Sequence, residues 1–472
     1  MNYVPSFVRY VKNFGCVMTS KSFKLSSIRP FLALAAALIA SHESLAGQTQ
    51  NLLDIYRQAQ SNDPNWASAQ SSRLAAQEKL VQGKALTLPT VTAGASANHS
   101  NTDIQYRGRT SFFGSGTESF ETYGYNVNLT HPLYHKQNSV QYEQSKTQVA
   151  QADEQLNTSR QDLMLRVSQA YFDVLLAQDK IDLIVAQKAA ITRQLEQAKA
   201  NFEVGTSTIT DVHEALARFD LTTAQEIAAV NDLEVRKRAI QAITTQLPMR
   251  LATAKSDLQT AIPQPADMES WVELAEQNNL ALKVQLQSLQ LASQQIELAH
   301  AGHLPTLDVV GSYADTRANG GVNGFGNDLK NLTVGLQLQV PLYQGGSITS
   351  KEREAAANRQ KAQDDVEAAR RQADLQARQT FLNVSSAVAQ VKAYEQALTS
   401  SQSQLDSTNL GYEVGVRTSV DVLNAQQQLF SAKRDLLQAR YTYLLSILQL
   451  KAAAGVLQEK DLSEISQLLE GS

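Results

Sequence analysis

The chain has 472 residues, with 42 Lys and Arg, 46 Asp and Glu, and a formal net charge of −4. Once an expected signal segment (residues 1–46) is removed, 37 basic and 45 acidic residues remain and the net charge becomes −8. A protein this acidic is not expected to bind nucleic acid through its overall charge. The only cysteine, Cys16, lies in that segment, so we expect neither a disulfide nor a lipid-modified cysteine in the mature protein.

Residues 1–46 are expected to be a signal peptide. Three basic residues between positions 21 and 29 precede ten apolar residues at 31–40, and small residues lead to a cleavage after Ala46. Met18 is a possible alternative start. A short buried helix is the other interpretation, but the basic flank argues against it. No later apolar run reaches the roughly 18 residues that a membrane-spanning helix needs, so no such helix is predicted.

The sequence repeats itself at a distance of 210 residues. Residues 202–215 and 412–425 are identical at seven of 14 positions, where unrelated segments would share about one. Two tripeptides also recur, Leu-Pro-Thr at 88–90 and 304–306, and Pro-Leu-Tyr at 132–134 and 341–343. The chain is therefore expected to contain two related halves: a first repeat at 47–255, a linker at 256–267 and a second repeat at 268–472.

Two very long helices are predicted from the absence of helix breakers. Proline is missing from 133–247 and after 341, and glycine is missing from 136–204 and 347–410. A helix of about 67 residues is about 100 Å long, so such helices must support one another sideways. A narrow heptad stripe indicates where they do so: Leu163, Val167, Ala170, Val174, Ala177, Ile181 and Ile184 in the first half, and Ala373, Ala377, Thr380, Val384, Ala387, Val391 and Tyr394 in the second. This stripe suits a wall one helix thick that is wet on at least one side.

Four segments alternate apolar and polar residues, which is typical of strands with one apolar face. We expect strands of nine to eleven residues near 90–101, 121–132, 306–316 and 331–341, paired through polar loops at 102–120 and 314–330. That length matches a tilted membrane-spanning strand. Four strands cannot close a membrane barrel, so either they form soluble hairpins or several chains pool them; a trimer would supply twelve.

Three segments carry a resemblance to a known family: residues 302–308 (GHLPTLD), 340–346 (VPLYQGG) and 411–418 (GYEVGVRT), the last leading to 420–423. They resemble the TolC-type outer-membrane channel-tunnels of Gram-negative bacteria, and the likeness covers nearly all of the mature chain. The resemblance implies a mixed α/β membrane protein with two internal repeats. It would be a homotrimer whose twelve-stranded outer-membrane β-barrel, four strands per chain, continues into a long periplasmic α-helical coiled-coil barrel.

The resemblance also implies a passive exit duct for tripartite efflux or type I protein secretion. Its partners would be a periplasmic adaptor (membrane fusion) protein and an inner-membrane pump of the RND or ABC type, with the lipid bilayer around the barrel and no cofactor. The alternative that we retain is a periplasmic coiled-coil adaptor or scaffold that bridges the membranes without a pore. The apolar strand faces favour the duct, because an adaptor has no need to present them to lipid.

Two glycine turns are expected to connect long helices, Val204-Gly205 in the first half and Val414-Gly415 in the second. Glycine supplies the left-handed conformation that ends a helix. Thr208 and Thr418 are placed to cap the helices that follow, with Asp211 and Asp421 at the third helical position. The resemblance puts these turns at the periplasmic entrance, where the adaptor and pump would dock.

The resemblance further implies that polar links close this entrance. They would join Arg417 to Thr210 and Asp211, and Tyr412 to Asp211, each worth about 0–1 kcal/mol near water. Asp421 would form a ring of carboxylates at the pore constriction. One turn further on, Asn424 stands where the family often has a second Asp, so strong cation block is not expected.

No motif in the sequence indicates an enzyme. His300 and His303, like His131 and His135, have a spacing that a metal could use, but neither pair has a suitably spaced third ligand, so no metal site is expected. The glycine-rich runs at 114–116 and 320–321 lack the strand-to-helix context of a nucleotide site. Catalytic residues are therefore not assigned.

Overall fold

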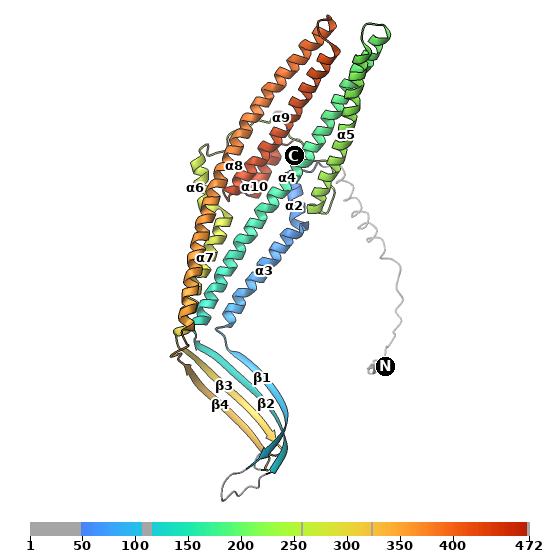
Figure 1. Cartoon of the computed structure of the whole chain (residues 1–472). Helices are drawn as coiled ribbons and strands as arrows, with labels where there is room; N and C mark the ends of the chain where they lie inside the picture. The colour runs from blue at the N-terminus through green and yellow to red at the C-terminus, as the bar shows by residue number, and fades with distance from the viewer. Residues whose placement is uncertain (1–48, 106–115, 256–257, 322–323, 470–472) are drawn as a thin grey trace, which may run out of the picture. The chain divides into compact units, whose positions relative to one another are not determined.

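The computed structural model describes residues 49–105, 116–255, 258–321 and 324–469 of the chain. The expected signal peptide at 1–46 and the middle of the expected loop at 102–120 lie outside these ranges. The described residues form one antiparallel sheet and a series of long and short helices (Figure 1). Within these ranges, no helix combines the length and the apolar character that crossing a membrane requires.

The sheet contains four strands in the order of the chain. They are β1 (Thr90–Ile104), β2 (Gly116–Tyr134), β3 (Thr306–Ala318) and β4 (Asn327–Gln339), and each neighbouring pair is antiparallel. The central pairing of β2 with β3 joins two hairpins that are far apart in the sequence (Figure 1). Strands β1 and β4 form the edges of this sheet, and no described strand pairs with their outer sides.

The register separates an apolar face from a polar face, as the alternation predicted. One row across the sheet consists of Ala93, Val127, Tyr313 and Leu332, and the row two residues along consists of Val91, Leu129, Gly311 and Val334. The row between them points to the opposite face and is polar: Thr92, Asn128, Ser312 and Thr333. On the apolar face, Leu332, Val334 and Leu336 are 70–73% exposed in the single chain.

The strands are longer than the nine to eleven residues expected from the apolar alternation. They contain 15, 19, 13 and 13 residues in chain order. The first hairpin continues to the pair Ile104↔Gly116, through positions that the sequence analysis assigned to a polar loop. Alternation predicts only where a strand has an apolar face, whereas the backbone ladder continues through polar residues.

The two long helices have almost the predicted length. Helix α4 (Lys136–Glu203) has 68 residues and α8 (Ser347–Glu413) has 67. Helices α3 (Pro64–Ala85) and α7 (Leu280–His300) lie beside the halves nearest the sheet, whereas α5 (Ile209–Thr244) and α9 (Ser419–Ala453) lie beside the far halves (Figure 1). The predicted heptad stripe is confirmed as a packing seam, because five of its seven positions in each half are buried.

The main apolar core lies at mid-length of α4 and α8. There the short helix α2 (Leu52–Asn62) packs against α4, α6 (Met268–Asn278) packs against α8, and α10 (Glu459–Gln467) packs against α2. The largest fully buried side chains of the core include Tyr56, Tyr171, Leu444 and Leu462. A 3-10 turn, Ala301–His303, connects α7 to β3. Thus the sheet and the far helix ends project from opposite sides of one core (Figure 1).

A hydroxyl–carboxylate contact joins α4 to α9 in this core. The hydroxyl of Tyr441 donates to Oδ2 of Asp179 at 2.5 Å. Burial raises the pKa of Asp179, and the hydrogen bond from Tyr441 opposes that rise. A carboxyl group whose folded pKa exceeds its unfolded value favours folding at low pH, and that contribution falls as pH rises towards the folded pKa.

We therefore expect Tyr441→Phe to destabilise the protein by about 1–3 kcal/mol near neutral pH, because a half-buried carboxylate loses its donor. Below about pH 4 the loss should be smaller, since Asp179 is then protonated. Tyr443→Phe is the matched control, because the Tyr443 hydroxyl donates at 3.0 Å to the carbonyl of Ala261, which does not titrate. Urea unfolding of the two purified variants between pH 4 and neutral pH measures their free energies of unfolding. If both losses of stability depend on pH in the same way, the Tyr441–Asp179 contact is not the cause.

The helix-turn tips as candidate functional site

The two glycine turns have the conformation that the sequence predicted. Gly205 has φ +75° and Gly415 has φ +78°, the left-handed region that suits glycine. Gly205 N–H donates to the carbonyl of Phe202 at 3.0 Å, and Gly415 N–H donates to that of Tyr412 at 3.1 Å. Val204 and Val414 are the preceding C-cap residues and are exposed. These turns form the ends of the helix pairs farthest from the sheet (Figure 1).

A complete capping box follows each turn. Thr208 N–H donates to Oδ2 of Asp211 at 2.9 Å, and Asp211 N–H donates back to the Thr208 hydroxyl oxygen at 3.3 Å. Thr418 and Asp421 repeat this arrangement at 2.9 and 3.2 Å. Both predicted caps are therefore confirmed. They fix the direction in which α5 and α9 leave the turns.

These caps also set the charge of the two carboxylates. The backbone N–H of Thr208 is the main cause that holds the pKa of Asp211 below its usual range, and burial partly opposes it. The backbone N–H of Thr418 acts likewise on Asp421, with a smaller favourable contribution from the charge of Arg417. Both groups are therefore carboxylates at neutral pH. Their contribution to the caps is lost only as pH falls through these lowered values.

Among the described residues of one chain, none of the three expected gate links is formed. The hydroxyl oxygen of Tyr412 accepts a hydrogen bond from Nδ2 of Asn201 at 3.1 Å, rather than contacting Asp211. Oδ2 of Asp211 accepts from the Ser207 and Thr208 hydroxyls, each at 2.8 Å. Among the described residues of a single chain, no hydrogen bond or ion pair joins Arg417 to Thr210 or Asp211. The predicted links between the helix pairs therefore remain predictions.

Arg417 is nevertheless positioned beside the expected constriction residues. Its N–H donates to the carbonyl of Gly411 at 3.0 Å, and a Cβ added at Gly411 would lie 2.7 Å from Cγ of Arg417. The glycine thus lets the arginine side chain lie against α8. Arg417, Asp421 and Asn424 line one polar groove of about 550 Å³ between α8 and α9. The groove therefore contains a cation, a carboxylate and an amide.

Polar contacts that the sequence analysis missed connect the two helix pairs near the tips. Nε2 of Gln194 on α4 donates to the Ser419 hydroxyl at 3.0 Å, and both side chains are buried. Arg218 on α5 donates to Oδ1 of Asn424 at 3.1 Å and also to Gln427. Asn424, expected in the pore ring, is thus engaged within its own chain. No spacing rule links positions 206 residues apart, so the sequence carried no signal for this contact.

A small apolar cluster supports these contacts. It consists of Ile191, Leu195 and Ala198 of α4, Val212 and Ala215 of α5, and Leu423 of α9, and we call it the tip cluster. Leu423 is 3% exposed and is the residue that α9 contributes to this cluster. The tip cluster contains no residue of the main core.

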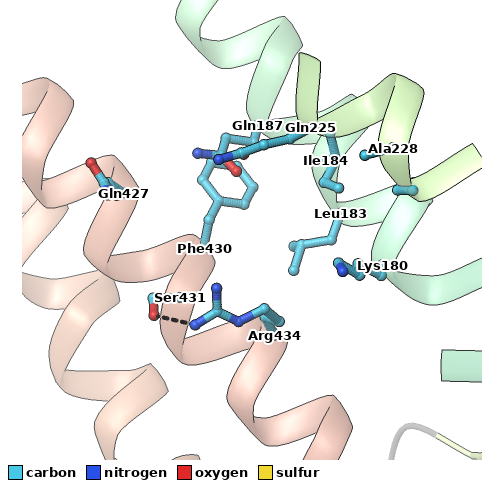
Figure 2. Close-up of a pocket in the computed structure, with 11 residues that line it drawn as sticks. Lys180, Leu183, Ile184, Gln187, Gln225, Ala228, Gln427, Phe430, Ser431 and Arg434 are labelled. Carbon is cyan, nitrogen blue, oxygen red and sulfur yellow. Dashed lines mark hydrogen bonds between the residues drawn. The ribbon is translucent and has the colours of Figure 1, made fainter. Parts of the chain in front are cut away.

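A cavity of about 370 Å³ separates the tip cluster from the main core. Its lining residues come from α4, α5 and α9, and include Lys180, Gln187, Gln225, Phe430 and Arg434 (Figure 2). Phe430 extends from α9 towards Gln187, while Arg434 donates to the Ser431 hydroxyl at 3.0 Å (Figure 2). The interface between the helix pairs is therefore loosely packed just below the tips.

Three of the four histidines singled out in the sequence lie beside a carboxylate. His300 lies 2.9 Å and His303 3.7 Å from the Glu352 carboxylate, and His135 lies 3.0 Å from that of Asp308. Within the described ranges, no group of three or more His, Cys, Asp or Glu side chains is arranged to hold a metal. These contacts lie where the sheet meets the helices.

The chain is similar to known outer-membrane channel proteins in both sequence and structure. The sequence pattern described as outer membrane efflux protein matches residues 55–246 and 271–456. Outer membrane protein TolC of Vibrio cholerae is 37% identical over 90% of this chain and 94% of the relative. Proteases secretion protein PrtF of Dickeya chrysanthemi is 30% identical over 92% and 94%. The crystal structure of the outer membrane protein VceC from Vibrio cholerae has the same fold, with a TM-score of 0.72, 19% identity and coverage of 86% and 96%.

The chain belongs to the outer membrane efflux protein family. The resemblance found in the sequence is thereby confirmed. The protein is located in the outer membrane, with its helical tunnel in the periplasm. Its relatives are channel and secretion proteins rather than enzymes.

The capping boxes yield a test of local stability at the tips. Thr208→Ala should lower the free energy of opening the first turn of α5 by about 1 kcal/mol, because Asp211 N–H loses its side-chain acceptor. Amide hydrogen exchange of that turn measures the effect. Thr223→Ala on the same helix, away from the turn, should leave the exchange unchanged; a similar effect from both substitutions would show that the cap is not responsible.

Proposed function

We propose that three copies of this chain form an exit duct through the outer membrane for efflux and type I protein secretion. Each chain would contribute its four strands to a twelve-stranded barrel and its long helices to a periplasmic tunnel with two structural repeats per chain. The duct is passive and not an enzyme, and it needs no cofactor. A periplasmic adaptor and an inner-membrane RND or ABC-type pump would open it by docking at the turns Val204-Gly205 and Val414-Gly415.

One observation carries this proposal: the sheet presents an apolar face and two unpaired edges. Edge strands β1 and β4 are 15 and 13 residues long, which is ample for spanning a bilayer at a tilt. Inside a membrane, unpaired backbone groups at such edges cost several kcal/mol each, so edges from neighbouring chains must pair. Closure by three chains gives twelve strands, an even number within the range of known barrels.

The exposed apolar face also discriminates against the alternative function. A periplasmic adaptor or scaffold would keep its strands in water, where a face carrying Leu332, Val334 and Leu336 would be an aggregation risk. In a bilayer the same face is stabilised by lipid. The membrane-spanning duct is therefore preferred over a bridging scaffold without a pore.

A closed resting state follows from the links at the tips. Contacts of Tyr412, Arg417 and Asp211 between helix pairs, repeated three-fold, would hold the periplasmic end shut. Each contact is partly solvated and worth about 0–1 kcal/mol, so a docking partner could overcome the set. Asp421 would supply one carboxylate ring at the constriction, with Asn424 one turn beyond it.

The lipid-facing assignment is tested by charges on the two sheet faces. Leu336→Asp should impair trimer assembly in the outer membrane, because a charge near the bilayer midplane costs up to a few kcal/mol. Gln337→Asp, on the opposite face of the same strand, should assemble normally. Membrane fractionation followed by gel analysis of unheated samples measures both. If both substitutions are tolerated equally, the apolar face of this sheet does not face lipid.

The gate assignment is tested by removing both of its partners on the α8/α9 turn. Arg417→Ser combined with Tyr412→Phe should raise the single-channel conductance in planar bilayers, because the weak links at the tip are lost. The thermal stability of the trimer should remain unchanged, since the heptad seam and main core lie elsewhere.

Arg434→Ser is the control for the loss of an arginine near the gate. Arg434 hydrogen-bonds only to Ser431 and Asp435 of its own helix among the described residues. This substitution should leave the conductance at the wild-type level. If the double substitution in properly assembled trimers also conducts like the wild type, the gate lies elsewhere.

A further inference from the structure

We propose that Arg218 is a gate-positioning residue that holds α9 against α5 inside each chain. We call its contacts with Asn424 and Gln427 the Arg218 clasp. The inference rests on the proposed function as a gated duct, but it concerns a contact within one chain rather than between chains. It assigns to Asn424 a role as acceptor of the clasp instead of a member of the pore ring.

The geometry of the clasp is that of a forked donor bridging two helices. One terminal nitrogen of the guanidinium donates to Gln427 and the other to Oδ1 of Asn424 at 3.1 Å. The second nitrogen also lies 3.5 Å from Glu214, one turn earlier on α5, which orients the arginine. The Arg218 side chain is 27% exposed, so these charge-assisted bonds are partly shielded from water.

The clasp joins α9 to α5, two helices that otherwise touch little, whereas α9 stays packed along α8. On α9, the tip cluster contributes only Leu423 and the main core begins at Leu436. The interval between them borders the cavity of about 370 Å³, which Gln427 also lines (Figure 2). Because α9 makes few contacts with α5, the position of the α8/α9 tip relative to α5 depends on polar contacts. Breaking the clasp would free the tip without exposing the main core.

The clasp lies next to the residues of the expected constriction. Asn424 lies one helical turn beyond Asp421, and both line the groove that contains Arg417. An outward displacement of α9 at Asn424 would therefore carry Asp421 and Arg417 with it. The clasp thus determines where these groups stand in the closed state.

A neutral acceptor at position 424 makes the clasp easy to break. A carboxylate there would form an ion pair with the guanidinium, which is stronger than a bond to an amide oxygen. Asn424→Asp should therefore tighten the closed state, but only while Arg218 is present. A simple pore-ring role predicts instead that the added charge alters cation block whether or not Arg218 is present.

The test is a double-mutant cycle at positions 218 and 424, read in planar bilayers as the fraction of time that assembled trimers spend open. Arg218→Ala should raise the open fraction about fivefold, the effect of losing one partly solvated hydrogen bond. Asn424→Asp should lower it in the wild-type background and leave it unchanged in the Arg218→Ala background. The thermal stability of the trimer should not change. The control is Arg236→Ala, because Arg236 on α5 pairs with Asp173 and Asp232 away from the tip.

A covalent version of the clasp provides a second measurement. Since Cys16 is the only cysteine of the sequence, the chain beyond residue 46 offers no competing thiol. Arg218→Cys combined with Asn424→Cys, bridged by a short reducible thiol crosslinker, should hold the duct closed, and reduction should reopen it.

The outcomes separate this inference from the proposed function. If Arg218→Ala leaves the open fraction unchanged while the Arg417→Ser, Tyr412→Phe variant raises it, the duct is gated but the clasp is not part of the gate. The inference is also overturned if Asn424→Asp has the same effect in both backgrounds. If wild-type trimers do not conduct at all, the proposed function fails, and the clasp has no gate to position.

Discussion

The unpaired edges of the four-stranded sheet are the constraint on which the rest of the structure depends. A sheet with one apolar face and two free edges is unstable alone in water, and its edges are not tolerated in lipid. Closure with strands from other chains satisfies both requirements. Helices α4 and α8 begin shortly after β2 and β4 and lead away from the sheet (Figure 1).

Stability is distributed unevenly along the long helices. The main core at mid-length combines α4, α8 and α9 with the short helices and contains most of the fully buried side chains. Towards the tips, the apolar contacts reduce to the tip cluster, and polar contacts from Gln194, Asn201 and Arg218 supplement them. A body that is rigid in its middle and weakly held at its ends is suited to a gate that opens without unfolding.

Much of this architecture could be predicted from the sequence because it depends on local patterns. The lengths of α4 and α8 follow from the positions of proline and glycine, the caps at Thr208 and Thr418 from residue spacing, and the sheet faces from alternation. The predicted strands were too short, because the pairing of Ile104 with Gly116 at the end of the first hairpin depends on backbone hydrogen bonds and not on alternating apolar residues. The contacts of Arg218 and Tyr412 could not be predicted, since they depend on how helices distant in sequence are rotated against each other.

The number of chains that close the sheet tests the account most directly. The detergent-corrected mass of the purified protein, measured by analytical ultracentrifugation or light scattering, should correspond to three chains, each of 51.7 kDa before any processing. Three chains supply the twelve strands that leave no free edge. A stable monomer that remains embedded in the membrane would contradict the account, because four strands would then have to tolerate open edges in lipid.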